Sequence, residues 1–219
     1  MTYRQAIIFD MDGLMVDSEP LARQAWEQIL QAHGYQMTND VYRQMIGLRI
    51  DQSIQIVLDN YPLPITASEL IAQKADIFHA IRAQGIPAMP GLMALQAAIK
   101  QRGIPWAVAT SSPCNHAEII LEQLGLIEDC HAIAAGNEVA NGKPSPDIYL
   151  LAAERLGIDP TICLALEDSE PGCRAAKVAG MKVVAIPNGE TKTAVFSCAH
   201  TRYSSLQQAA DNLEILLAD

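Results

Sequence analysis

The sequence predicts an α/β fold, a doubly wound parallel sheet with a smaller helical domain inserted into it. The first observation behind this prediction is a set of short apolar runs bounded by turn residues, which is typical of strands buried on both faces. The runs cover residues 6–9, 104–109, 131–135, 162–166 and 181–186. The second observation is that amphipathic segments separate most of the runs. Such alternation favours an open parallel sheet.

The amphipathic segments have apolar residues three or four positions apart, and a glycine follows each of them. They cover residues 91–102, 115–124, 145–156 and 171–179. Glycine commonly ends a helix in the left-handed conformation, so each segment is expected to form one helix that crosses over between two strands.

The alternation is interrupted between the first two runs. The intervening chain has helical patterns at 21–32, 51–60 and 68–84 but no convincing strand. A plain crossover needs little more than a dozen residues, so the excess predicts an inserted helical cap. We expect residues 1–16 and 88–219 to form the core domain and residues 17–87 the cap, with hinges near 14–18 and 84–90.

Composition excludes several classes of protein. Half of the 219 residues are hydrophobic and 18% are charged, which argues for a buried core and against disorder. The 15 Lys and Arg against 25 Asp and Glu leave a net charge of −10, and no basic run reverses this field. We therefore expect no nucleic-acid partner.

Apolar runs and cysteines indicate the compartment. The runs are far shorter than the roughly 18 residues that suggest a membrane span, and the first meets Asp10 at once, so we expect neither membrane contact nor a signal peptide. The five cysteines are odd in number and lack CxxC spacing, which favours reduced thiols in a cytoplasmic protein. A monomer is the default expectation.

Polar side chains follow the apolar runs at the edge of the sheet where ligands bind in doubly wound folds. They are Asp10 and Asp12 after the first run, Thr110, Ser111 and Ser112 after the second, Lys143 after the third, and Glu167 and Asp168 after the fourth. Four carboxylates at one edge repel one another unless positive charge lies among them. All-oxygen ligands point to Mg²⁺, and one lysine adds a second positive group.

A hard cation, an ammonium group and a hydroxyl suit a phosphoryl group, whose transfer depends on positioning and charge stabilisation. No Gly-x-x-x-x-Gly-Lys-Ser/Thr loop is present, so a nucleotide triphosphatase is not indicated. Attack by Asp10 on phosphorus would form an aspartyl phosphate. Asp12 would protonate the leaving alcohol and later deprotonate the attacking water.

Four ordered segments resemble the motifs of the haloacid dehalogenase-like hydrolases, in the branch of β-phosphoglucomutase and small sugar-phosphate phosphatases. They are FDMDGLMVDSEP at 9–20, AVATSS at 107–112, GKPSP at 142–146 and LEDS at 166–169. The resemblance covers nearly the whole chain, and it implies a Rossmann-like core with a helical cap that excludes water and selects the leaving group.

The resemblance also implies roles for individual residues. Asp10 would be the nucleophile and a Mg²⁺ ligand, and Asp12 the general acid and base, which also binds the metal through its backbone carbonyl. Thr110 would bind the phosphoryl oxygens, and Lys143 would balance the charge of nucleophile and phosphate. The metal would also be held by Asp168, with Glu167 beside it.

Within the family, Asp12 argues against a dehalogenase, because a halide leaves without a proton. The mutases place a histidine soon after the residue matching Asp17, where this chain reads SEPLA at 18–22, so a hexose-phosphate mutase is the second reading. A phosphonate hydrolase would need a cap lysine, and Lys74 is the only lysine there. A sensor of phosphorylated sugars without catalytic activity is the alternative from another class.

Substrate contacts outside the core motifs are less specific. Ser111 belongs to the second motif, Arg49 lies where related proteins carry a specificity loop, and Asn115 follows the second motif. We expect these three side chains to contact a small phosphorylated metabolite, a sugar or polyol phosphate. The five histidines have no metal-binding spacing, and we expect them to be structural or exposed.

Overall fold

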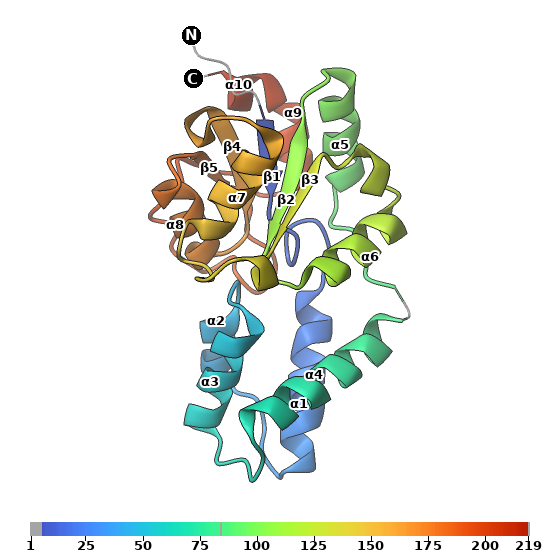
Figure 1. Cartoon of the computed structure of the whole chain (residues 1–219), viewed down its shortest axis with the longest axis vertical. Coiled ribbons are helices and arrows are strands. Elements are labelled where there is room, and N and C mark those ends of the chain that lie inside the picture. Colours follow the sequence, from blue (N-terminus) through green and yellow to red (C-terminus); the bar gives the residue numbers. More distant parts are fainter. Residues whose placement is uncertain (1–5, 84, 219) are drawn as a thin grey trace.

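The computed structural model describes residues 6–83 and 85–218, which form a core built around a sheet and a group of helices at one end of it (Figure 1). Residues 1–5, 84 and 219 are outside the described part, so the expected helix over 68–84, the hinge at 84–90 and both domain ranges are considered without them. Within the described residues, no helix combines the length and apolar character that a membrane crossing requires.

Six parallel strands form one sheet in the order β3-β2-β1-β4-β5-β6. They are β1 (Ala6–Phe9), β2 (Trp106–Thr110), β3 (Ala132–Ala135), β4 (Cys163–Glu167), β5 (Lys182–Ala185) and β6 (Thr201–Arg202). The order runs outward in both directions from β1, as in a doubly wound sheet, so the predicted fold class is confirmed. Strand β6 was not expected, because two residues leave no apolar run.

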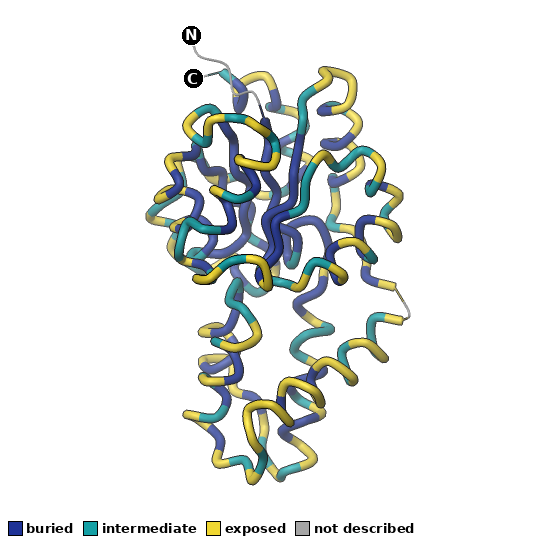
Figure 2. Tube along the Cα trace, in the orientation of Figure 1, coloured by how far each residue is buried: buried dark blue, intermediate teal, exposed yellow. Residues whose placement is uncertain are grey.

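Helices cover both faces of the sheet. They are α5 (Leu92–Gln101), α6 (Cys114–Leu124), α9 (Leu206–Asp211) and α10 (Leu213–Leu217) on one face, and α7 (Asp147–Leu156) and α8 (Glu170–Val178) on the other. Alternate residues of β1 enter the two hydrophobic clusters, Ile7 and Phe9 on one face and Ala6 and Ile8 on the other. Strands β1, β2 and β4 are therefore buried along their whole length, whereas β3, β5 and β6 include half-buried or exposed residues (Figure 2).

Four helices form the group at the end of the core: α1 (Glu19–Ala32), α2 (Asn39–Met45), α3 (Ile50–Asn60) and α4 (Ala67–Arg82). They pack around their own hydrophobic cluster, which includes Trp26, Tyr42, Val57 and Leu70. Helix α2 was not expected, because its seven residues span only two turns. Its N-terminus is capped by Thr38, whose hydroxyl accepts a hydrogen bond from the Val41 amide.

Two chain segments connect this helical group to the core, and they lie side by side. Val16 and Ala88 form an antiparallel bridge, in which the Asp17 amide donates to the Pro87 carbonyl at 2.8 Å and the Met89 amide to the Met15 carbonyl at 2.8 Å. The predicted boundaries between core and cap, at residues 16/17 and 87/88, fall at this bridge. The division into two domains remains a prediction. The two chain connections between the helical group and the core thus lie next to each other in one narrow strip.

A buried carboxyl group joins α1 to α2. The Tyr42 hydroxyl donates to Glu19 Oε2 at 2.5 Å and lies 2.8 Å from the Glu19 carbonyl oxygen. Burial raises the pKa of Glu19 to about 7, although the Tyr42 hydrogen bond lowers it. Glu19 is therefore harder to ionise in the folded protein than in the unfolded chain.

This shift predicts how Glu19→Gln changes the pH dependence of stability. Below about pH 4.5 the carboxyl group is protonated in both states, but at higher pH the unfolded chain ionises first and the wild type loses stability. The advantage of the glutamine variant in unfolding free energy should therefore grow between pH 4.5 and 7 and then level off. Urea unfolding across this range measures it, and a difference that is constant with pH would contradict the buried acid.

Gly91 provides a second test of the fold. It precedes α5 with φ of 90°, and a Cβ atom there would collide with the backbone nitrogen of Gln207 in α9. We expect Gly91→Ala to lower the unfolding free energy by at least about 3 kcal/mol, because the backbone at residue 91 or at Gln207 must move to make room. Gly103→Ala is the matched control: Gly103 also has positive φ, but nothing lies within 4 Å of an added Cβ. Its cost should be about 1 to 2 kcal/mol in urea unfolding.

Candidate active site

The carboxyl ends of β1, β2 and β4 bring the predicted site residues together. Phe9 lies opposite Val108 and Leu166 in the sheet, so the residues that follow these positions emerge at one edge. The Asp10 amide donates to the Leu166 carbonyl at 3.0 Å and thereby fixes the start of the first loop. The site consequently depends on strand register, which the two buried faces of the sheet specify.

Lys143 is the centre of the buried charges. Its ammonium group is 2.5 Å from Asp10 Oδ1 and 2.6 Å from Glu167 Oε1, and its side chain is only 1% exposed. Although burial lowers it, Asp10 and Glu167 together raise the pKa of Lys143 above its usual value. The lysine, on the loop between β3 and α7, is thus held as a cation against the first strand.

Glu167 is anchored through both of its oxygens. Oε1 accepts hydrogen bonds from Lys143 and from the Tyr149 hydroxyl, the latter at 2.8 Å. Oε2 accepts from the amides of Asp168 and Ser169 at 3.0 Å and from the Ser169 hydroxyl at 2.9 Å. Glu167 is therefore engaged in orienting the lysine, and its expected place among the metal ligands stays a prediction.

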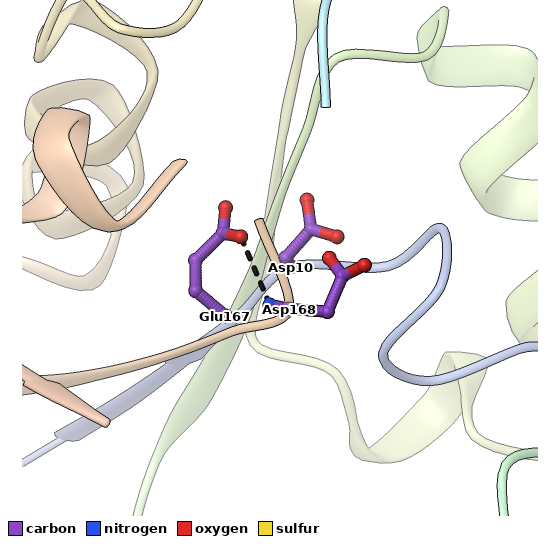
Figure 3. A group of neighbouring side chains, drawn as sticks. All are labelled: Asp10, Glu167 and Asp168. Carbon is purple, nitrogen blue, oxygen red and sulfur yellow. Dashed lines mark hydrogen bonds between the residues drawn. The ribbon is translucent and has the colours of Figure 1, made fainter. Parts of the chain in front are cut away.

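Three carboxylates fit a divalent cation. Asp10, Glu167 and Asp168 each offer an oxygen, and these oxygens lie within 4.8 Å of one another (Figure 3). Burial raises the pKa of Asp10 to about 8, with Lys143 opposing the shift, and raises the pKa of Asp168 well above its usual value. One lysine does not balance three buried acids, so the oxygen-only cluster suits Mg²⁺ in charge and in ligand type.

Asn188 completes the surroundings of Asp168, and sequence reasoning missed it. Its side-chain amide donates to Asp168 Oδ2 at 2.8 Å and to the Gly13 carbonyl at 3.1 Å. The asparagine therefore ties the fourth motif to the first. Asn188 could have been found from the sequence, because it follows the fifth apolar run at 181–186, as the other site residues follow theirs.

Asp12 is held by hydroxyl groups. Ser18 donates to Oδ1 at 2.8 Å, Ser112 to Oδ2 at 2.8 Å, and Thr110 to Oδ2 at 3.2 Å. Burial alone would raise the pKa of Asp12, but the nearby His116 ring and the two serine hydroxyls lower it below the usual range. Asp12 and Thr110 are thus brought together, as the motifs predict.

A cavity of about 370 Å³ lies between the helical group and the core. Asp10, Asp12, Ser111 and Asn115 are among the core residues that line it. On the opposite wall are Glu19, Trp26, Ile71, Lys74, Phe78 and Arg82. The cavity therefore joins the acidic edge of the sheet to the inserted helices, and its volume is that of a small-molecule site.

Arg49 lies outside this lining. Its guanidinium group donates to the Val139 carbonyl at 3.0 Å and to the Asp51 carboxylate at 2.7 Å. It therefore connects the loop before α3 to the core loop after β3. Its expected contact with substrate stays a prediction, which this arrangement of the side chain does not support.

His116 is a second site residue that sequence reasoning did not single out. Its buried ring lines the cavity, and Nε2 is 3.8 Å from Asp12 Oδ1. Its position in α6 gives no signal in the sequence, because the contact depends on packing between residues 104 positions apart. His116 and Asp12 thus lie next to each other in the lining of the cavity.

Comparisons with known proteins agree with this geometry. Hexitol phosphatase B of Escherichia coli K12 is 32% identical over 207 residues, 93% of each chain. The phosphorylated carbohydrates phosphatase of Thermotoga maritima is 31% identical over 178 residues, 81% of this chain and 82% of that one.

A solved structure shares the whole architecture. The crystal structure of CbbY from Rhodobacter sphaeroides in complex with phosphate has a TM-score of 0.84 and 33% identity, and it covers 94% of this chain and 96% of that one. A family model described as haloacid dehalogenase-like hydrolase matches residues 5–180. The resemblance seen in the four motifs is thus confirmed, and the chain belongs to the haloacid dehalogenase-like hydrolases.

Proposed function

We propose that this protein is a Mg²⁺-dependent phosphatase that hydrolyses a small phosphate monoester, a sugar or polyol phosphate, through an aspartyl phosphate. The observation that carries the proposal is the buried contact of Asp10, which lines the cavity, with Lys143, next to Asp168. Relatives named as phosphatases of hexitols and of phosphorylated carbohydrates support the choice of substrate.

In the first step, Asp10 attacks phosphorus and the bond to the leaving alcohol breaks. Asp12, two residues on and lining the same cavity, would enter this step as the carboxylic acid and give its proton to the departing oxygen. Thr110 and Lys143 flank the two aspartates and would hold the phosphoryl oxygens, which become more negative during transfer. The phosphoryl group is then covalently bound to Asp10.

In the second step, water releases the phosphate. Asp12, now a carboxylate, accepts a proton from this water as it attacks the phosphorus of the aspartyl phosphate. Asp10, Asp168 and the Asp12 carbonyl would hold Mg²⁺, which would supply positive charge to the phosphoryl oxygens. Inorganic phosphate leaves, and Asp10 is regenerated.

The inserted helices are proposed to act as a cap over residues 88–219 and 1–16, as the sequence suggests. They form the wall of the cavity opposite Asp10, and the paired segments at Val16 and Ala88 provide a narrow hinge. Closure would exclude water from the phosphoryl site and select the leaving group. The cytoplasmic location, the monomer and the absence of nucleic-acid or membrane partners remain predictions.

A panel of hexose, hexitol and glycerol phosphates tests the proposed function. We expect release of inorganic phosphate with Mg²⁺, and loss of it in EDTA that added Mg²⁺ reverses. Asp10→Asn should lower kcat by at least about 10⁴-fold, since removing a nucleophile that acts with its partners is severe. Circular dichroism should show that the variant is folded. Turnover by the folded, metal-loaded variant would contradict the role of Asp10.

Glucose 1-phosphate with a hexose bisphosphate primer separates the phosphatase from the mutase. We expect inorganic phosphate as the product and no glucose 6-phosphate, because residues 18–22 lack the histidine that the mutases carry. Phosphorus NMR distinguishes the two products in one sample. An accumulation of the isomer would instead establish the mutase, and absence of both products across the panel would favour a sensor.

A further inference from the structure

The His116 ring lies between Asp12 and the cap. Asp12 is the proposed general acid and base. His116 belongs to α6 of the core, its side chain is 8% exposed, and its Nε2 atom is 3.8 Å from Asp12 Oδ1. Nε2 is buried and has no hydrogen-bond partner. A buried polar atom left unpaired costs about 1 to 3 kcal/mol, so this position needs an explanation.

The other ring nitrogen is engaged by the cap. Nδ1 of His116 contacts Nη1 of Arg82, the last residue of α4. A guanidinium group donates hydrogen bonds and accepts none, so Nδ1 is the acceptor in this contact. The ring proton then resides on Nε2, and the donor that it forms faces Asp12.

Helix α4 also fixes the plane of the ring. Phe78, one turn before Arg82, packs on His116 with ring centroids 5.6 Å apart. The guanidinium group of Arg82 is itself bonded to His79 Nδ1 at 3.2 Å. Both the orientation and the tautomer of this core histidine are therefore set by side chains of the cap.

The remaining partners of Asp12 cannot do the same. They are hydroxyl groups, whose protons can reorient so that the oxygen donates to one partner or another. Thr110 is also proposed to bind the phosphoryl oxygens, which would compete for its proton. A fixed N–H donor that faces Oδ1 can hold the Asp12 carboxyl group in one orientation both before and after the proton on the group is transferred.

We propose that His116 is a positioning residue for Asp12, and that Arg82 of the cap directs its donor toward that carboxylate. A shift of about 1 Å would bring the two atoms from 3.8 Å to hydrogen-bond distance. Docking of α4 thus orients the group that transfers protons to and from the leaving oxygen. The inference rests on the proposed function, because it needs Asp12 as the general acid.

Leaving-group dependence tests the inference. The kcat/KM value reports steps through the first irreversible one, which for an alkyl phosphate needs a proton from Asp12. For 4-nitrophenyl phosphate it does not, since nitrophenolate leaves unprotonated. We expect His116→Leu to lower kcat/KM by about 10- to 100-fold for the alkyl phosphate that the wild type hydrolyses fastest in the panel. The aryl phosphate should change by less than about twofold.

Three further variants sharpen the test. His116→Gln keeps an N–H donor and should recover most of the alkyl rate. Arg82→Met should lower the alkyl rate several-fold and spare the aryl rate, and it tests the coupling even if leucine at the buried position prevents folding. His33→Gln, at the end of α1 and away from the cavity lining, is the control and should change neither rate.

The outcomes separate the two proposals. Equal losses on both esters in His116→Leu and Arg82→Met would assign a general structural role and overturn the inference, as would unchanged rates on both. Failure of the glutamine variant to recover the alkyl rate would also count against it. If the wild type hydrolyses no ester with Mg²⁺, the proposed function falls and the inference with it.

Discussion

The contact of one buried ammonium group with two buried carboxylates constrains the rest of the core. Removing Lys143, Asp10 and Glu167 from water costs several kcal/mol for each charge, and good geometry must compensate for it. The chain supplies this geometry through the Tyr149 hydroxyl and the amides that follow Glu167. Helix α8 also has to leave room for this cluster, since a Cβ atom at its residue Gly172 would collide with the Glu167 carboxylate. Buried charges that shift one another's pKa in this way are typical of functional sites.

Much of the core could be predicted because short-range patterns determine it. Apolar runs mark strands buried on both faces, and parallel strands bring their carboxyl ends to one edge. The proximity of Asp10 and Asp168, which directly follow their strands, could therefore be predicted without the conformation of the loops. Lys143 lies on the loop between β3 and α7, and its place was predicted from its motif. The same reasoning could not find α2 or β6, whose seven and two residues carry too little periodicity. Their positions are decided by packing and by pairing with β5.

The side of the site formed by the cap was beyond prediction for another reason. Whether Arg49 or Lys74 faces the cavity depends on how four helices pack and on how the whole group sits against the core. Arg49 connects two loops, whereas Lys74 lines the cavity. His116 was equally hidden, because its neighbours Asp12 and Arg82 come from the core and the cap and only meet in the assembled fold.

The two walls of the cavity have opposite chemistry. The core wall presents carboxylates and hydroxyls, whereas the cap wall places Lys74 between the rings of Trp26 and Phe78, at 5.4 and 4.3 Å from their centroids. Burial lowers the pKa of Lys74 to about 8, so the aromatic faces stabilise a cation that has lost most of its water. A cationic side chain of the cap thus lines the cavity opposite the carboxylates of the core, although the chain as a whole carries −10. On the proposed function, a change confined to this wall would alter which alcohol departs and would leave the phosphoryl chemistry of the core edge in place.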